Sequence, residues 1–211
     1  MTVIADIRAN VRKDLHDEDA AAYIWTDAVL DRHIAHAVAD YSTHAPLEQK
    51  TTLTTTAGSR DLSISTLAGL VAVERVEWPV GQYPPQFVGF STWGTTLTID
   101  NASAPAGVEN VYVYWTKEHL VDAAGSTLPL AHEDVIAVGA VAYAAHDRET
   151  LTINKINVGG EVWGRYKALA DECMATFQKE LRRLARNNTV RQRRLYSTNA
   201  PSVFEQGRVK Y

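Results

Sequence analysis

Residues 128–149 read LPLAHEDVIAVGAVAYAAHDRE, and this stretch indicates the centre of the fold. Valine and isoleucine recur at helical spacing among alanines and one glycine, which predicts a helix over residues 129–148. Glu133 and Asp134 directly follow Leu-Pro-Leu, and acids are favoured in the first turn of a helix. The small residues let neighbouring helices approach closely. We therefore expect a buried central helix against which the rest of a helical bundle packs.

Three more amphipathic helices are predicted, two before the central helix and one after it. The first covers residues 2–15, and the second begins at the N-cap Thr26 and is stopped by Pro46. The longest spans about 161–187 and follows a loop with a Gly-Gly pair. Its apolar stripe comprises Tyr166, Leu169, Cys173, Phe177, Leu181 and Leu184. Because each stripe needs a partner, we expect the four helices to bury their apolar faces together.

Residues 49–118 have a different pattern. Short stretches rich in threonine, valine, isoleucine and aromatic residues alternate with Gly, Pro, Ser and Asn breakers. They predict about five or six antiparallel strands in a compact sandwich or barrel. The expected strands are 51–56, 62–65, 71–78, 86–90, 95–100 and 108–117. Residues 111–115 are apolar on both faces, so this run should be central or covered on its outer face by another element.

The predicted fold class is therefore α+β, a helical bundle of about four helices with an inserted antiparallel β-sandwich or barrel and an extended C-terminal arm. Residues 1–48 and 119–188 form the helical domain, residues 49–118 the inserted β-module and residues 189–211 the arm. The β-module is interpreted as an insertion because the helices on both its flanks need each other. The arm has no helical periodicity and no core of its own.

Charge is distributed unevenly along the chain. The formal net charge is −4, yet residues 182–211 hold eight basic residues and one acid, a balance of +7. The other 181 residues hold 13 bases and 24 acids, a balance of −11. A basic tail on an acidic body suggests that the tail docks onto an acidic surface of a partner or neighbouring subunit, or onto nucleic acid.

Composition excludes several classes of protein. Hydrophobic residues make up 45% and charged residues 22% of the 211, which is close to the globular average and excludes wholesale disorder and fibrous repeats. We expect neither a signal peptide nor a membrane span. The single cysteine, Cys173, excludes an intramolecular disulfide and a thiolate zinc cluster, so folding in a reducing cytoplasm is expected, with stability from packing or assembly.

No enzyme signature is present in the sequence. The phosphate-binding, dinucleotide-binding, zinc-protease and hydrolase motifs are all missing. His132, Glu133 and Asp134 are better explained as the start of a helix than as an acid–base cluster. Residues 146–149 resemble a solvated helix end, and Cys173 falls on an apolar stripe where an inert thiol is usual. We therefore expect no catalytic site, no cofactor and no enzymatic activity.

Three histidines are the candidates for a metal site. His33, His36 and His44 share the second predicted helix and could present imidazoles to a metal. They lack carboxylate or thiolate partners in a recognisable pattern. We interpret them as surface or interface histidines, and no metal site is expected.

Aromatic residues gather in the β-module. They could form a platform for sugars or single-stranded nucleic acid, but few basic residues accompany them, and aromatics in short strands more often fill a small core. We favour the core interpretation. The residues concerned are Trp78, Tyr83, Phe87, Phe90, Trp93, Tyr112, Tyr114 and Trp115.

The C-terminal arm is the strongest functional feature. A solvated tail is one explanation of its composition. Apolar anchors set among arginines that can pair with carboxylates favour a segment that folds onto a partner. The predicted contact residues are Arg191, Arg193, Arg194, Leu195, Tyr196, Phe204, Arg208 and Tyr211.

The order of these elements resembles a known family. The segment WTDAVLDRHIAHAVADYS (25–42), the β-rich middle, the helix of residues 128–149 and the long helix that runs into a basic arm are similar to the head-to-tail connector, or adaptor, proteins of tailed bacteriophages. The resemblance spans essentially the whole chain and rests on element order, not on an invariant motif. The β-module departs from the smallest members, which leaves its task open among the exterior, the ring interface and the tail.

The resemblance implies a structural virion protein made in the host cytoplasm and located at the neck of the particle. Copies would form a ring, commonly dodecameric, beneath the portal, and the arm would bind the portal while the opposite side receives the next tail or neck protein. Double-stranded DNA would pass through the lumen without sequence-specific binding, and no membrane is involved. An acidic body suits such a channel, since a basic lining would hold phosphates.

Two other functions stay open on the sequence. The aromatic β-module could recognise a host carbohydrate or receptor while the helices attach it to a virion. A small hydrolase or other enzyme with an unrecognised site is the third possibility, although no pair of titratable groups with an evident partner supports it.

Overall fold

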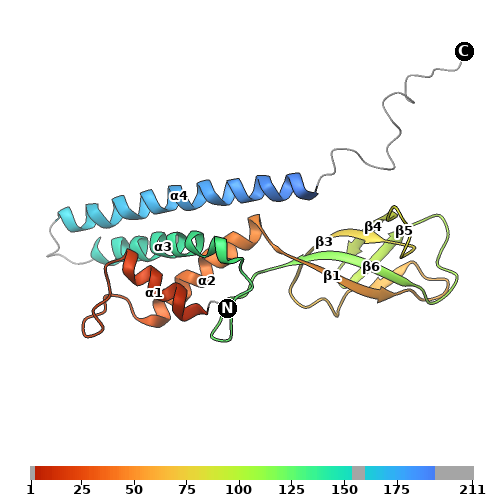
Figure 1. Cartoon of the computed structure of the whole chain (residues 1–211), viewed down its shortest axis with the longest axis horizontal. Helices are drawn as coiled ribbons and strands as arrows, with labels where there is room; N and C mark the ends of the chain where they lie inside the picture. The colour runs from red at the N-terminus through yellow and green to blue at the C-terminus, as the bar shows by residue number, and fades with distance from the viewer. Residues whose placement is uncertain (1–2, 154–159, 193–211) are drawn as a thin grey trace, which may run out of the picture.

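The computed structural model describes residues 3–153 and 160–192. Four helices occupy one end of the molecule and a six-stranded antiparallel sheet occupies the other (Figure 1). The α+β class expected from the sequence is confirmed. The helices are α1 (Ile4–Asp14), α2 (Asp27–His44), α3 (Glu133–Ile153) and α4 (Gly160–Gln192), with a short 3-10 helix, η1 (Leu130–His132), before α3. Within the two described ranges, no helix is both long and apolar enough to cross a bilayer.

The ends of α2 are set by the residues that the sequence places there. The side chain of Thr26 accepts a hydrogen bond from the backbone N–H of Val29 at 3.4 Å, which satisfies one of the free donors of the first turn. After His44 the helix stops at the C-cap Ala45, directly before Pro46, which has no backbone N–H to continue it. The chain then leaves the helices for the sheet.

Helix α3 is the centre of the helical end, as predicted. Its Ile136, Ala140 and Ala144 are fully buried and belong to one apolar cluster with residues of α1, α2 and α4. Gly139 allows the close approach of α4, because a Cβ at this position would lie 2.8 Å from Cε2 of Phe177. The helical body, as we call α1 to α4 together, is therefore packed around a strip of small residues.

The sheet contains six strands near the predicted positions. They are β1 (Leu47–Thr54), β2 (Asp61–Ser63), β3 (Leu70–Glu77), β4 (Phe87–Trp93), β5 (Thr96–Asp100) and β6 (Asn110–Lys117), in the order β1-β6-β3-β4-β5-β2. Strand β6 lies between β1 and β3. This confirms the central place expected for residues 111–115, whose Val111, Val113 and Trp115 are buried.

The six strands form one continuous sheet that curls into a half-barrel, which resolves the open choice between a sandwich and a barrel (Figure 1). The first two residues of β4 pair with β3, and residues 89–93 pair with β5. The concave side encloses a second apolar cluster, which contains Leu62, Val76, Leu97, Ile99 and Val113. No residue belongs to both clusters.

Helix α4 extends farther than the sequence analysis expected. Its 33 residues correspond to about 50 Å at 1.5 Å per residue, whereas the 21 residues of α3 correspond to about 32 Å. Figure 1 shows α4 alongside α3 and running on toward the sheet. The helix ends at Gln192, so Arg191 lies in its last turn and not in an extended arm that starts at residue 189. The two asparagines at 187 and 188 do not break the helix, because neither is a strong helix breaker.

Candidate functional site

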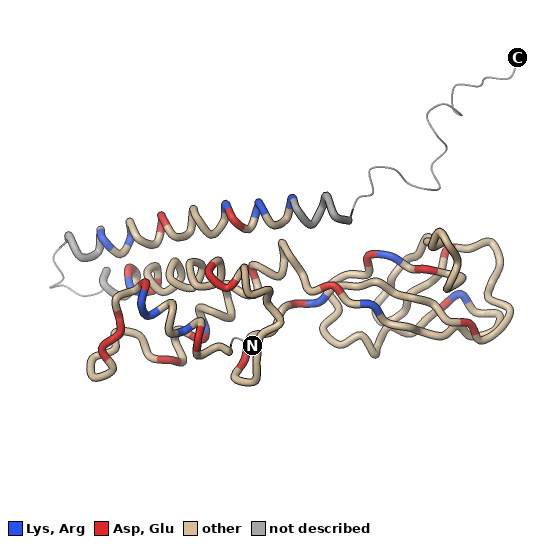
Figure 2. The backbone as a smooth tube through the Cα atoms, in the orientation of Figure 1, with Lys and Arg blue, Asp and Glu red and all other residues tan. Residues whose placement is uncertain are grey.

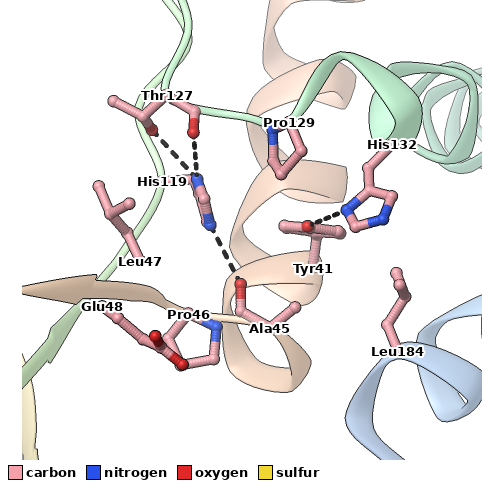
Figure 3. Close-up of a pocket in the computed structure, with 10 residues that line it drawn as sticks. All are labelled: Tyr41, Ala45, Pro46, Leu47, Glu48, His119, Thr127, Pro129, His132 and Leu184. Atoms are coloured by element: carbon pink, nitrogen blue, oxygen red, sulfur yellow. Dashed lines mark hydrogen bonds between the residues drawn. The ribbon is translucent and has the colours of Figure 1, made fainter. Parts of the chain in front are cut away.

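The junction between the helical body and the sheet is organised by a buried histidine. His119, two residues after β6, has its backbone N–H bonded to the hydroxyl of Ser42 at 3.0 Å. Its ring Nε2 lies 3.1 Å from the carbonyl oxygen of Ala45, and Nδ1 lies 3.1 Å from the hydroxyl of Thr127 (Figure 3). Nδ1 also lies 3.0 Å from the carbonyl oxygen of Thr127, so each ring nitrogen faces a carbonyl oxygen. Burial lowers the pKa of His119, whereas hydrogen bonds to the carbonyls of Thr127 and Ala45 oppose this shift.

A second histidine fixes the start of α3. Nδ1 of His132 lies 2.6 Å from the phenolic oxygen of Tyr41, which is within hydrogen-bond distance, and burial raises the pKa of Tyr41 (Figure 3). Both imidazoles therefore join α2 to the segment that follows the sheet. They surround a cavity of about 510 Å³ together with Pro46, Leu47 and Leu184. The polar groups here orient segments of the chain.

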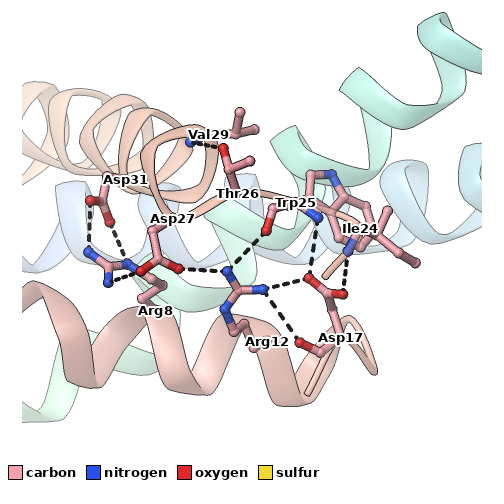
Figure 4. A network of polar contacts seen from close by, with 9 residues as sticks. All are labelled: Arg8, Arg12, Asp17, Ile24, Trp25, Thr26, Asp27, Val29 and Asp31. Atoms are coloured by element: carbon pink, nitrogen blue, oxygen red, sulfur yellow. Dashed lines mark hydrogen bonds and ion pairs between the residues drawn. The ribbon is translucent and has the colours of Figure 1, made fainter. Parts of the chain in front are cut away.

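An ion-pair network fastens the loop between α1 and α2 (Figure 4). The buried guanidinium of Arg12 donates to Asp17 at 2.6 Å, to Asp27 at 2.7 Å and to the carbonyl oxygen of Trp25 at 3.0 Å. The Asp17 carboxylate also accepts the backbone N–H groups of Ile24 and Trp25. A hydrogen bond from Arg12 lowers the pKa of Asp27. The network is structural, since every group in it is occupied by a partner within the chain.

The three candidate metal-ligating histidines do not converge. His33 is buried, and its Nε2 is 3.8 Å from the Asp147 carboxylate, too far for a hydrogen bond. His36 stacks on Tyr143 with ring centroids 4.0 Å apart. His44 bonds within its own helix to Thr43 and the carbonyl of Asp40. Across the described residues, no group of three or more His, Cys, Asp or Glu side chains is arranged to hold a metal ion.

The other candidate reactive groups have structural positions. Glu133 and Asp134 occupy the first turn of α3, as expected. Nδ1 of His146 lies 3.1 Å from the carboxylate of Glu149. Cys173 packs against the apolar cluster of the helical body, and burial raises the pKa of its thiol, which keeps it protonated and unreactive.

The core interpretation of the aromatic residues is right for some and wrong for others. Trp115 is buried and donates to the Thr51 hydroxyl at 2.9 Å. By contrast, Tyr83 is 98% and Trp93 is 90% exposed. Trp93 ends β4 just before the Gly94 turn, and Tyr83 lies in the loop between β3 and β4, so neither faces the concave side. A pattern of residue types does not separate strand centres from turns.

Helix α4 carries a basic stripe that was not predicted from the sequence, and only its three arginines fall within the basic tail of residues 182–211. We use this name for Lys179, Arg182, Arg183 and Arg186, which are all exposed. Their i, i+3, i+4 and i+7 spacing places them on one side of a helix, opposite the buried stripe of Phe177, Leu181 and Leu184. Figure 2 shows one group of basic residues near the end of α4 that approaches the sheet and another near the start of the helix. This spacing is the signal that would have revealed the stripe.

The predicted arm contacts fall almost entirely outside the described residues. Arg191 is in the last turn of α4. The remaining seven, Arg193, Arg194, Leu195, Tyr196, Phe204, Arg208 and Tyr211, lie beyond residue 192. Their role as partner contacts stays a prediction.

Comparison with solved structures finds distant similarities. One chain in the neck of an empty gene transfer agent particle, computed with C6 symmetry, is 14% identical, with 74% of this chain and 79% of that chain covered and a TM-score of 0.29. A chain in the virion of a native gene transfer agent particle is 17% identical, with 82% and 91% covered and a TM-score of 0.28. No protein with a curated description matches the chain.

Comparison with family models gives a match over nearly the full length. The model described as SU10 adaptor protein matches residues 1–202, which include the helical body and the sheet. The adaptor family expected from the order of the elements is thereby confirmed. The chain belongs to the SU10 adaptor protein family.

Proposed function

We propose that this protein is a structural, non-enzymatic component of a tailed virion. Its copies form a closed ring, dodecameric in this proposal, beneath the portal and join the DNA-filled head to the next neck or tail protein. The protein acts at the neck after synthesis in the host cytoplasm. The observation that carries the proposal is the match of the adaptor family model to residues 1–202.

The organisation of the chain supports this role. Residues 1–48 and 119–188 are the helical domain that packs side by side in the ring, and residues 49–118 are the β-module attached to it. The close packing of Gly139 against Phe177 makes the helical body stiff, as a subunit under load requires. Heterologous contacts between stiff copies close into a ring when their rotation divides a full turn.

The C-terminal arm is the proposed portal contact. It follows α4, whose exposed basic stripe brings positive charge to the point where the arm begins. Arginines there pair with portal carboxylates while Leu195, Tyr196, Phe204 and Tyr211 supply apolar anchors. Ordering such a segment costs free energy, so attachment becomes strong only when many arms bind a complete ring of sites.

The lumen is proposed to pass double-stranded DNA without sequence-specific contacts. Outside its last thirty residues the chain holds 13 bases and 24 acids. A wall with excess negative charge does not bind phosphates, so the DNA slides through it.

Removing the arm tests the proposal directly. Deletion of residues 193–211 leaves α4 complete at Gln192. In particles assembled with this variant, we expect that the protein does not attach stably to filled heads. In the parent particles, we expect electron microscopy to show a ring of full-length copies at the neck. Unimpaired attachment of the deletion variant contradicts the portal contact, and parent particles without a ring of this chain contradict the adaptor role.

A receptor-binding β-module is the second candidate, favoured by the exposure of two aromatic side chains. Tyr83 and Trp93 are 98% and 90% exposed, and exposed aromatics suit stacking on sugar rings. Binding of the full chain to a panel of host glycans, lost in Trp93→Ala with unchanged folding, supports this function. If the parent chain and Trp93→Ala bind glycans equally, or if neither binds, Trp93 has no part in receptor binding.

A further inference from the structure

The segment that leads from the sheet into the first turn of α3 is acidic. Residues 118–134, here called the acidic linker, contain Glu118, Asp122, Glu133 and Asp134 and no lysine or arginine. Two leucines are also unusually open to solvent, since Leu120 is 59% and Leu130 is 77% exposed. Negative charge beside exposed apolar side chains is typical of a surface that is covered in an assembly.

The acidic linker is held in one conformation. The carboxylate of Asp122 accepts the backbone N–H groups of Ala124 and Gly125 at 2.7 and 2.9 Å. The backbone N–H of Ile4 donates to the carbonyl of Asp122 at 3.1 Å, and that of Thr127 donates to Leu120 at 2.9 Å. A surface fixed in this way loses little entropy when a partner binds.

The basic stripe of α4 lies at the same level but points the other way. Leu184, between Arg183 and Arg186 in sequence, lines the junction cavity with His119, Thr127 and His132 of the acidic linker. The linker is therefore on the inner side of α4, whereas the basic stripe is on the opposite side of the same turns. The four carboxylates of the linker cannot neutralise the stripe of their own chain.

We propose that the basic stripe of one copy docks on the acidic linker of the next copy, and that this contact forms the ring. The inference rests on the proposed adaptor function and identifies its subunit interface. Two complementary surfaces on opposite sides of one subunit make a heterologous contact, which repeats from copy to copy. Opposite charges set the partner and the register, and burial of Leu120 and Leu130 adds apolar area.

The alternative ligand for a basic helix face is duplex DNA. DNA would bind the stripe through phosphates and would leave the acidic linker and its exposed leucines without a partner. The second copy explains both surfaces with one contact, which is why it is preferred.

Charge-reversal variants test the contact in virions. One chain carries Arg182→Glu and Arg186→Glu, which leaves the Arg183–Glu180 ion pair in place. The other carries Glu118→Lys and Asp134→Lys. Each is supplied to cells infected with a phage that lacks its own copy of this gene, and the copies of the chain per particle are counted by mass spectrometry. We expect each variant alone to be incorporated about tenfold less than the parent chain, because like charges then face each other.

Supplying both variants together gives the decisive result. In an alternating ring, every second contact pairs the acidic stripe of one variant with the basic linker of the other. The remaining contacts pair the unchanged basic stripe with the unchanged acidic linker, so every contact is attractive and incorporation is expected to recover. Recovery in the mixture, with neither variant active alone, supports the proposal. Incorporation of either single variant at the level of the parent, or a mixture that stays as poor as its components, overturns it.

Three controls separate the possible failures. Thermal unfolding of both variants should stay close to that of the parent, because the altered side chains are exposed. Loss of Asp134 from the first turn of α3 should cost the linker variant no more than about 1 kcal/mol. If the parent chain is absent from the particles, the adaptor function is refuted. If both variants are incorporated as well as the parent, only the proposed interface is refuted. Stripe-dependent binding of a fluorescent DNA duplex, together with a mixture that fails to recover, assigns the stripe to DNA.

Discussion

The helical body and the curled sheet bury their apolar side chains in different ways. The body packs a strip of small residues on α3 between three other helices, and its aromatic Tyr41 and Phe177 are fully buried. The sheet encloses a smaller cluster on its concave side and leaves Tyr83 and Trp93 in solvent. The two clusters share no residue, and His119, which follows β6, lies 3.1 Å from the carbonyl oxygen of Ala45 at the end of α2.

Because the two clusters share no residue, we predict that each region can open without the other. A body packed on all sides supplies a stiff unit for assembly, whereas a one-sided sheet has surface left for contact. Local opening of each region can be followed separately by hydrogen exchange of its peptides.

Removing the charge of Arg12 should have the largest effect. Arg12→Met leaves the Asp17 carboxylate, which is 4% exposed, without its buried partner, at a cost of about 3–5 kcal/mol. We expect faster hydrogen exchange in α1 and α2 and unchanged exchange in β1 to β6. The double variant Arg12→Met, Asp17→Asn should recover part of the loss. Equal loss of protection in the sheet would show that the two regions unfold together.

Two tryptophans of the sheet should respond very differently to truncation. Trp115→Ala opens a cavity in the small core and removes the bond to Thr51, which should cost about 3 kcal/mol in the free energy of unfolding. Trp93→Ala should change it by less than about 0.5 kcal/mol because that side chain is 90% exposed. Urea denaturation of both variants measures the difference. Similar losses in the two would contradict the separation of core from surface in the half-barrel.

The close contact of α3 with α4 should reject a larger residue. In Gly139→Val a Cβ would lie 2.8 Å from the Phe177 ring, which should cost about 1–3 kcal/mol as the helices move apart. Gly164→Ala in α4 is the matched control, since its Cβ would meet no atom within 4 Å and helix propensity should raise stability by about 1 kcal/mol. Thermal unfolding followed by circular dichroism at 222 nm compares them. A neutral Gly139→Val would mean that α3 and α4 are loosely packed.

The junction should tolerate loss of one hydrogen bond. Tyr41→Phe removes the bond to His132 and should cost about 0.5–1.5 kcal/mol. Exchange should rise at η1 and the first turn of α3, with no change at β3 to β5. Faster exchange in the sheet alone would contradict this expectation, because it would mean that the Tyr41–His132 contact mainly stabilises the sheet.

Acidification should act on the segments outside the sheet. Burial and the positive charge of Arg32 lower the pKa of His33, while Asp147 opposes the shift, so the unfolded chain binds a proton more readily than the folded one. Stability is therefore complete above the ordinary pKa of histidine, near 6.5, and falls as the pH drops below it. All seven histidines lie outside residues 47–117, so the sheet should keep its protection between pH 7.5 and pH 5. Replacement of His33 by Gln should reduce the pH dependence of the body.

Much of this architecture could be predicted from local patterns. The alanine-rich stretch of α3, the cap at Thr26 and the alternation of residues 111–115 each depend on neighbours within a few positions. The helix, strand and α+β assignments therefore agree with the structure. The end of α4 was misplaced because two asparagines reduce helix propensity only slightly and do not stop a long helix.

The site depended on contacts between distant positions. Residues 42, 45 and 127 meet at His119 only because the chain returns from the sheet to the end of α2, and no spacing in the sequence encodes that return. The exposure of Trp93 likewise follows from its place beside a turn. Sequence alone established the classes of the elements, the acidic body with its basic tail and the family resemblance, since composition and periodicity are local. Tertiary packing decided which aromatic side chains face solvent and which side of α4 faces the junction, because packing brings together residues that are far apart in the chain.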